Sequence, residues 1–234
     1  MNLFYSYNTN VSNAYIITVL GNPTSEQFAQ RCANSCQAVD MAYKLWPAFD
    51  GTGSDIKVPD HSVNDSIINM LKITDHYLTR GEVACALSHI SLWRHCAVID
   101  QPIVILEHDA VMVKKFQTLN SFNSIVYLGG SEWAQQNWKM YPIPPHASEG
   151  PNYHFICRAH AYAIDPCVAK NLLSHVIKMG ICSPLDIMMR ADLFNITHQG
   201  LYAYDLSDNR TNDTTIKQRP ISGRTTQRND KLEY

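Results

Sequence analysis

The chain has 234 residues, of which 45% are hydrophobic, and a formal net charge of -2. This length can bury most of the unfolded surface around one core, so we expect a single domain over residues 1–216, followed by a polar, basic tail over residues 217–234. The charge indicates no generic polyanion partner. No window reaches the roughly 20 apolar residues of a membrane span, and no basic start precedes an apolar run, so a cytoplasmic protein is expected.

The first 50 residues read as a strand, a helix and a second strand. Ala14 to Leu20 are β-branched and aromatic, and turn residues follow them. A polar helix is expected from Ser25 to about Lys44. Trp46 to Phe49 then lead into a turn at residues 50–53, and residues 54–76 form a candidate surface excursion.

A helix with a defined start follows. Thr79 and Glu82 have the T-x-x-E spacing of a capping box. An apolar face should follow at the helical spacing of Val83, Leu87 and Ile90. The second face is small and polar, and could contact either a ligand or another helix; it comprises Ala84, Ser88, Ser91 and His95.

Alternating strands and helices fill the rest of the chain and indicate an α/β fold. Ile103 to Leu106 are a continuous aliphatic run, typical of a central parallel strand buried on both faces. The proline-containing segment 132–154 reads as a long functional or mobile loop. Further strands are expected at residues 124–130, 159–164 and 201–206, with a helix at residues 166–179.

Two acids follow the central strand. Alternation along the strand would place Glu107 and Asp109 on one side, with His108 on the other. Two oxygen ligands beyond the carboxyl end of a strand suit Mg²⁺ or Mn²⁺, especially when a substrate diphosphate completes the shell. The alternative is a pair of solvated acids, or an acid that caps a neighbouring helix. Seven cysteines without C-x-x-C spacing read as reduced, buried thiols.

The stretch LTRGEVACALSHISLWR, residues 78–94, resembles the G-E-I-G-C-A-L-S-H motif of glycosyltransferase family 25. ILEHDAV follows where this family has an L-E-D-D-V segment. WPAFDG resembles its P-A-x-D-G turn, and SPLDIMM resembles its P-I-D segment. The resemblance covers roughly Ala14 to Met189. It implies a GT-A type fold with a mostly parallel central sheet flanked by helices, a UDP-linked sugar donor and inversion at the anomeric carbon.

The resemblance also implies roles for individual residues. Glu107 and Asp109 match the outer acids of the family's E-D-D and would bind Mn²⁺ or Mg²⁺, while His108 departs from the middle acid. Asp186 matches the aspartate of P-I-D and is the candidate base; it could instead be the N-cap of a helix. His198 would be a third metal ligand or a surface histidine. The residues expected near the nucleotide are Leu20, Asp50, Arg80, Ser88 and His89, of which His89 could instead be a core histidine.

We therefore predict a metal-dependent inverting glycosyltransferase that moves a hexose or related sugar from a UDP-sugar to a hydroxyl acceptor. A glycan, as in lipopolysaccharide biosynthesis, or a protein would be the acceptor. A modified nucleic-acid base is the weaker alternative, because no strong basic stripe is present. A non-catalytic nucleotide-sugar-binding module is a further alternative, motivated by His108. The basic tail could close over the diphosphate, contact an anionic acceptor or be a disordered end.

Overall fold

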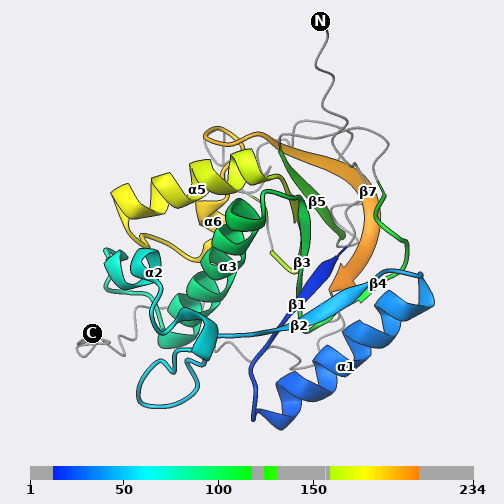
Figure 1. Ribbon diagram of the computed structural model, residues 1–234, viewed down its shortest axis with the longest axis horizontal. Helices are drawn as coiled ribbons and strands as arrows, with labels where there is room; N and C mark the ends of the chain where they lie inside the picture. The colour runs from blue at the N-terminus through cyan, green and yellow to red at the C-terminus, as the bar shows by residue number, and fades with distance from the viewer. Residues whose placement is uncertain (1–12, 118–123, 131–155, 157–158, 206–234) are drawn as a thin grey trace, which may run out of the picture.

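The protein is an α/β sandwich built on one seven-stranded sheet with helices on both faces (Figure 1). The computed structural model describes residues 13–117, 124–130, 156 and 159–205. The strands are β1 (Ala14–Thr18), β2 (Tyr43–Pro47), β3 (Ile103–Glu107), β4 (Ala110–Met112), β5 (Ile125–Gly130), β6 (Ala161–Ile164) and β7 (Ile196–Asp205). The helices are α1 (Pro23–Ala38), η1 (Asp60–Ser62), α2 (Ser66–Met70), α3 (Arg80–Ile99), α5 (Pro166–Met179) and α6 (Leu185–Met188).

The strand order is β2-β1-β3-β6-β5-β7-β4, and the sheet is mixed. β1 pairs in parallel with β2 and β3, and β5 pairs in parallel with β7. β6 is antiparallel to both β3 and β5, and β4 is antiparallel to β7. The expectation of a mostly parallel sheet was therefore wrong, because three of the six pairings between described strands are antiparallel. Only the β2-β1-β3 edge is parallel throughout.

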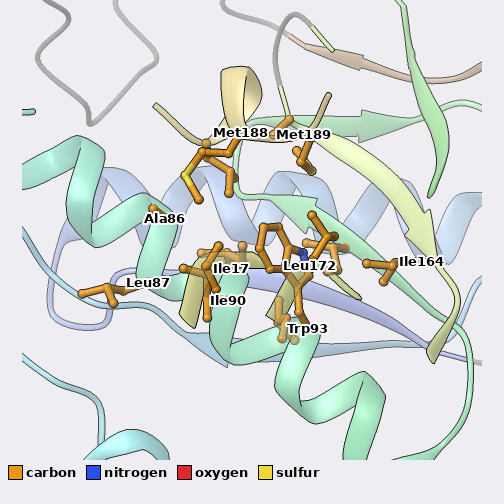
Figure 2. Packing of buried hydrophobic residues seen from close by; sticks show 14 of the residues in the cluster. Ile17, Ala86, Leu87, Ile90, Trp93, Ile164, Leu172, Met188 and Met189 are labelled. Carbon is orange, nitrogen blue, oxygen red and sulfur yellow. The ribbon is translucent and has the colours of Figure 1, made fainter. Parts of the chain in front are cut away.

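β3 is buried on both faces, as its aliphatic run predicted. Ile103 and Ile105 enter the core beneath α3 and α5, whereas Val104 and Leu106 enter the core beneath α1. The larger core surrounds Trp93 and Ile90 of α3, with Leu172 from α5 beside them (Figure 2). Because successive side chains of a strand point to opposite faces, one aliphatic run serves both layers.

α1 is shorter than predicted. The side chain of Asn22 accepts a hydrogen bond from the backbone N–H of Ser25, and Pro23 begins the helix at a position where its missing N–H costs nothing. The helix ends at Ala38, and Asp40 then takes a positive φ of 53°. The predicted helix to about Lys44 therefore extended too far, since Tyr43 and Lys44 belong to β2.

α3 begins with the predicted capping box. The Thr79 side chain accepts from the backbone N–H of Glu82, and the Glu82 carboxylate accepts from the backbone N–H of Thr79. Both of its expected faces are buried, including Val83, Leu87 and Ser88. The cap thus fixes the start of the helix that contributes most residues to the site described below.

Residues 54–76 are partly integrated into the fold. Asp65 caps α2 and also forms an ion pair with Arg94 of α3, with 2.8 Å between Oδ2 and Nε. Ile68 and Leu71 are buried, so this segment is more than a surface excursion. The tail after residue 205 and the whole of the proline-containing loop, residues 132–154, lie outside the described residues. Within the described part, no helix combines the length and apolarity needed to cross a membrane.

Candidate functional site

A small pocket lies where the carboxyl ends of β1 and β3 meet the N-terminal half of α3. It holds about 70 Å³ of space, and its lining includes Phe49, Gly51, Cys85, His89, Glu107 and Asp109. This edge of parallel strands is where open α/β sheets place their ligands. A space of this size suits an ion or a few waters, and a larger groove adjoins it.

Glu107 ends β3 and points toward α3. Its Oε1 lies 3.3 Å from His89 Nε2 and 3.9 Å from Cys85 Sγ. Residues 108 and 109 form a turn, so strand alternation stops at Glu107, yet the side chain of Asp109 is buried and lines the same pocket. The structure therefore brings together the two carboxylates that were predicted to bind a cation.

His108 lines the pocket as well, and its ring lies against α1. Its Nδ1 is 3.4 Å from the hydroxyl of Ser25, and its ring stacks on Phe28 with 5.9 Å between centroids. Burial, together with the positive charge of Arg31, lowers the pKa of His108 to about 4. The residue that replaces the middle acid of the family motif is thus a neutral packing group.

His89 is completely buried and belongs to a hydrogen-bonded chain that runs into the core. The hydroxyl of Tyr162 lies 2.8 Å from His89 Nδ1 and accepts a hydrogen bond from Trp93 Nε1 at 2.9 Å. Burial lowers the pKa of His89 to about 3, so the ring is neutral. The sequence allowed His89 to be either a core histidine or a residue of the site, and it is both: it is buried with hydrogen-bond partners, and its Nε2 faces the pocket.

Cys85 was not among the predicted site residues, because the cysteines were interpreted as reduced, buried thiols. Burial raises the pKa of the Cys85 thiol, and the charges of Glu107, Asp186 and Asp109 raise it further. Of these carboxylates, Glu107 is in contact with the thiol, with 3.9 Å between Oε1 and Sγ. The sequence did contain a pattern that could have indicated Cys85: it lies four residues before His89, which places the two side chains one helical turn apart on the same face.

Asp186 is the second residue of α6, whose N-cap is Pro184. The alternative that Asp186 caps this helix is therefore wrong. Its side chain is partly exposed, and Oδ1 accepts from the backbone N–H of Ile187 at 3.0 Å. Its charge contributes to the raised pKa of Cys85, so Asp186 lies within electrostatic range of the pocket.

A groove of about 570 Å³ adjoins the pocket, and Ala48 lines both. Its lining includes Leu20, Trp46, Asp50, Lys57, His61 and His95. Burial would raise the pKa of Asp50, but hydrogen bonds from Thr52 and the charge of Lys57 outweigh it and lower that pKa. Two of the residues expected near the nucleotide, Leu20 and Asp50, thus line this groove.

Ser88 and Arg80 lie where the loop after β2 meets α3. The hydroxyl of Ser88 donates to the carbonyl of Ala84 and accepts from the backbone N–H of Phe49 at 2.9 Å. Arg80 is the first residue of α3, and its carbonyl oxygen lies 2.5 Å from where a Cβ on Gly51 would sit. Ser88 also lines the pocket, so it both holds the loop and faces the site.

His198 lies on β7, and its Cα pairs with that of Tyr127 on β5. β6 and β5 separate β7 from β3 in the sheet. The orientation of its side chain lies outside the described part of the structure, so its role as a third metal ligand stays a prediction.

The model of glycosyltransferase family 25, described as a lipopolysaccharide biosynthesis protein family, matches residues 24–189. This match covers more than half of the chain. The chain belongs to glycosyltransferase family 25. No curated protein matches it. As a family-25 protein it is a glycosyltransferase, which requires a sugar donor and an acceptor. The matched region contains α3, the pocket residues from Ala48 to Asp109, and Asp186.

The pocket of this family-25 glycosyltransferase fits a divalent cation by the chemistry of its side chains. Glu107 and Asp109 supply hard oxygen ligands from one turn, and the side-chain Oδ1 of Asp109 is buried. Oxygen ligands of this kind suit Mg²⁺ and Mn²⁺. Cys85 and His89 add a thiol and an imidazole on the α3 side of the same pocket.

Proposed function

We propose that the protein is a metal-dependent inverting glycosyltransferase of the GT-A type that transfers a hexose or related sugar from a UDP-sugar to a hydroxyl acceptor. The carrying observation is that Glu107 and Asp109 line one pocket with Cys85 and His89 at the carboxyl edge of the parallel strands. Cation binding and proton removal both need carboxylates; the pocket contains two, and the charge of a third, Asp186, acts on its Cys85. The parallel β2-β1-β3 edge supports a nucleotide site at this position.

Glu107 and Asp109 are the residues that would hold the cation. When bound, the ion would supply positive charge that neutralises the departing diphosphate. Glu107 is held by the His89 imidazole, and Asp109 by the tight turn between β3 and β4. Carboxylates fixed in this way lose little freedom when they bind, which favours affinity.

The groove beside the pocket is the proposed place of the nucleotide. Its volume of about 570 Å³ lies in the range of small-molecule and cofactor sites. Leu20 and Trp46 offer it apolar and aromatic surface, while Asp50 and Lys57 offer polar groups. Ala48 lies at the junction of the two cavities, so a donor in the groove would reach the carboxylates with its diphosphate end.

Asp186 is the proposed general base. It comes from α6 and does not line the pocket, so it is separate from the carboxylates assigned to the cation. An inverting transfer needs a base that accepts the acceptor hydroxyl proton as the oxygen attacks the sugar from the face opposite the diphosphate. A partly exposed carboxylate is accessible to such a hydroxyl.

A panel of UDP-sugars, scored for UDP release with and without acceptor, tests this proposal. We expect Asp186→Asn to bind UDP like the wild type and to lose transfer by at least about 100-fold, the lower range for general-base catalysis. The matched control is Asp100→Asn, an exposed aspartate that pairs with Lys170 at the far end of α3. Transfer by Asp186→Asn at the wild-type rate would refute the base assignment. UDP binding without transfer in the wild type would favour the binding-module alternative.

A further inference from the structure

The pocket contains a second, softer set of ligand atoms. Cys85 Sγ, His89 Nε2 and Glu107 Oε1 all lie within 4.8 Å of one another. Within this set, Nε2 is 3.3 Å and Sγ is 3.9 Å from the carboxylate oxygen. Cys85 and His89 are four residues apart on α3, and Glu107 faces them from the end of β3. Two ligands at i and i+4 of a helix face one ion, as in helical zinc motifs.

The separations match the size of a zinc ion. With sides of 3.3 Å, 3.9 Å and at most 4.8 Å, the triangle of ligand atoms has a centre within about 2.4 Å of all three. Zinc bonds are ~2.3 Å to sulfur and ~2.0–2.2 Å to nitrogen and oxygen. A shift of a few tenths of an ångström would therefore bring all three atoms to bonding distance.

The surroundings of His89 resemble those of a metal-ligating histidine. Its other ring nitrogen, Nδ1, is 2.8 Å from the hydroxyl of Tyr162, which is in turn held by Trp93. Such outer partners fix the orientation and tautomer of a ligating ring. Without an ion, the neutral ring can donate from Nε2–H to Glu107; with an ion bound, Nδ1–H would donate to the tyrosine oxygen and the lone pair of Nε2 would face the ion. An oxygen with two lone pairs can accept from both Trp93 and His89.

We propose that Cys85, His89 and Glu107 form a three-ligand site for Zn²⁺, with the fourth position open to the pocket. A thiolate, an imidazole and a carboxylate are a mixed donor set that favours zinc over magnesium or manganese. Three protein ligands with an open position are the arrangement of zinc sites that bind a further ligand. The inference goes beyond the proposed transferase, since it requires no nucleotide sugar. It makes Glu107 common to both cation sets, while Asp109 belongs to the hard set alone.

Cobalt is a spectroscopic probe for this site, because Co²⁺ bound to a thiolate absorbs in the near ultraviolet. The reduced, metal-free protein is titrated with Co²⁺ and then with Zn²⁺. We expect the wild type to develop the thiolate absorption, and one equivalent of Zn²⁺ to remove it. X-ray absorption of the zinc-loaded wild type should show one sulfur neighbour. Absence of the cobalt–thiolate band, or of sulfur around zinc, would overturn the proposal without any variant.

Matched variants locate the ion. Cys85→Ser should lose the cobalt band and weaken Zn²⁺ binding by at least about 100-fold, whereas Cys167→Ser, at an exposed free cysteine, should change neither. Tyr162→Phe should keep the band but weaken Zn²⁺ by about 10- to 100-fold, as removal of an outer partner does. Asp109→Asn should keep the band, which separates this site from the cation pair of the proposed transferase. A band that survives in Cys85→Ser, or that disappears in Asp109→Asn, would contradict the assignment.

The two proposals fail independently. UDP-sugar turnover with Mn²⁺, measured on the same preparations, reports on the transferase alone. A cobalt–thiolate band in a protein without turnover would leave the zinc site standing. Turnover in a protein without the band would leave the transferase standing and remove the zinc site.

Discussion

His89 of α3 and His108 of the turn after β3 both line the pocket, and both are neutral in the folded protein near pH 7. Burial lowers the pKa of His89 to about 3, and burial with the charge of Arg31 lowers that of His108 to about 4. An unfolded histidine titrates near ~6.5. Below that pH the unfolded chain binds protons that the folded chain rejects, so stability decreases as the pH falls.

The resulting prediction concerns unfolding in a metal chelator. For each histidine, the free energy of unfolding should fall by up to about 1.4 kcal/mol per pH unit below pH ~6, until the folded pKa is reached. Urea titrations between pH 7 and pH 4.5 measure this slope. His108→Gln should reduce the slope of the unfolding free energy against pH by about the contribution of one histidine. An unchanged slope in this variant would show that His108 is protonated in the folded state.

The sequence anticipated the carboxylates of the site but not their neighbours. Glu107 and Asp109 could be found because two acids follow an aliphatic strand and match a family motif. The contact of Cys85 with Glu107 could not, since it depends on how closely α3 approaches the end of β3. Likewise, His89 could be read as a ligand or as a core residue until Tyr162 and Trp93 were seen to hold it.

At the scale of elements, α3 depends on its capping box for the position of its first turns. Thr79→Ala removes the side-chain acceptor for the backbone N–H of Glu82. We expect a loss of about 1 kcal/mol in the free energy of unfolding, measured by urea denaturation. Thr79→Ser, which keeps the hydroxyl, is the control and should stay close to the wild type. An equal loss in both variants would mean that the methyl group, not the cap, carries the effect.

The loop after β2 lies directly against α3, and Gly51 permits this approach. A Cβ at position 51 would be 2.5 Å from the carbonyl oxygen of Arg80 and 3.0 Å from the Cβ of Ala84. Gly51→Ala should therefore cost about 1–3 kcal/mol of stability, the range for overpacking, and displace the loop that lines the pocket. Gly53→Ala is the control, because its nearest contact would be at 3.7 Å. Urea denaturation and UDP titration measure both effects, and equal behaviour of the two variants would contradict this role for Gly51.

Local sequence patterns predicted most helices and strands, but they did not predict which neighbouring strands are parallel and which are antiparallel. The capping box marked the start of α3, and proline after a strand marked the start of α5. Buried strands look alike whether they are parallel or antiparallel, so AYAI gave no sign that β6 runs against β3. The end of α1 at Ala38 was also missed, because the sequence around Asp40 contains no glycine or proline that would mark its positive φ.

At the scale of the whole molecule, the fold gathers short segments from distant parts of the chain at one edge of the sheet. Cys85 and His89 come from α3, Glu107 and Asp109 from the end of β3, and Asp186 from α6. The groove beside them is formed by β2 and the segment around η1. The family match identifies the chain as a glycosyltransferase. The structure has a small pocket of a size suited to an ion, next to a groove large enough for a nucleotide.

Calorimetric titration of UDP into the protein with Mn²⁺ tests the central claim most directly. We expect the wild type and Asp100→Asn to bind UDP only when Mn²⁺ is present. Asp109→Asn should bind at least about 100-fold more weakly, a loss of about 2.7 kcal/mol, because one of the two hard ligands is missing. Wild-type protein that shows no Mn²⁺-dependent UDP binding, or Asp109→Asn with wild-type affinity, would contradict the account.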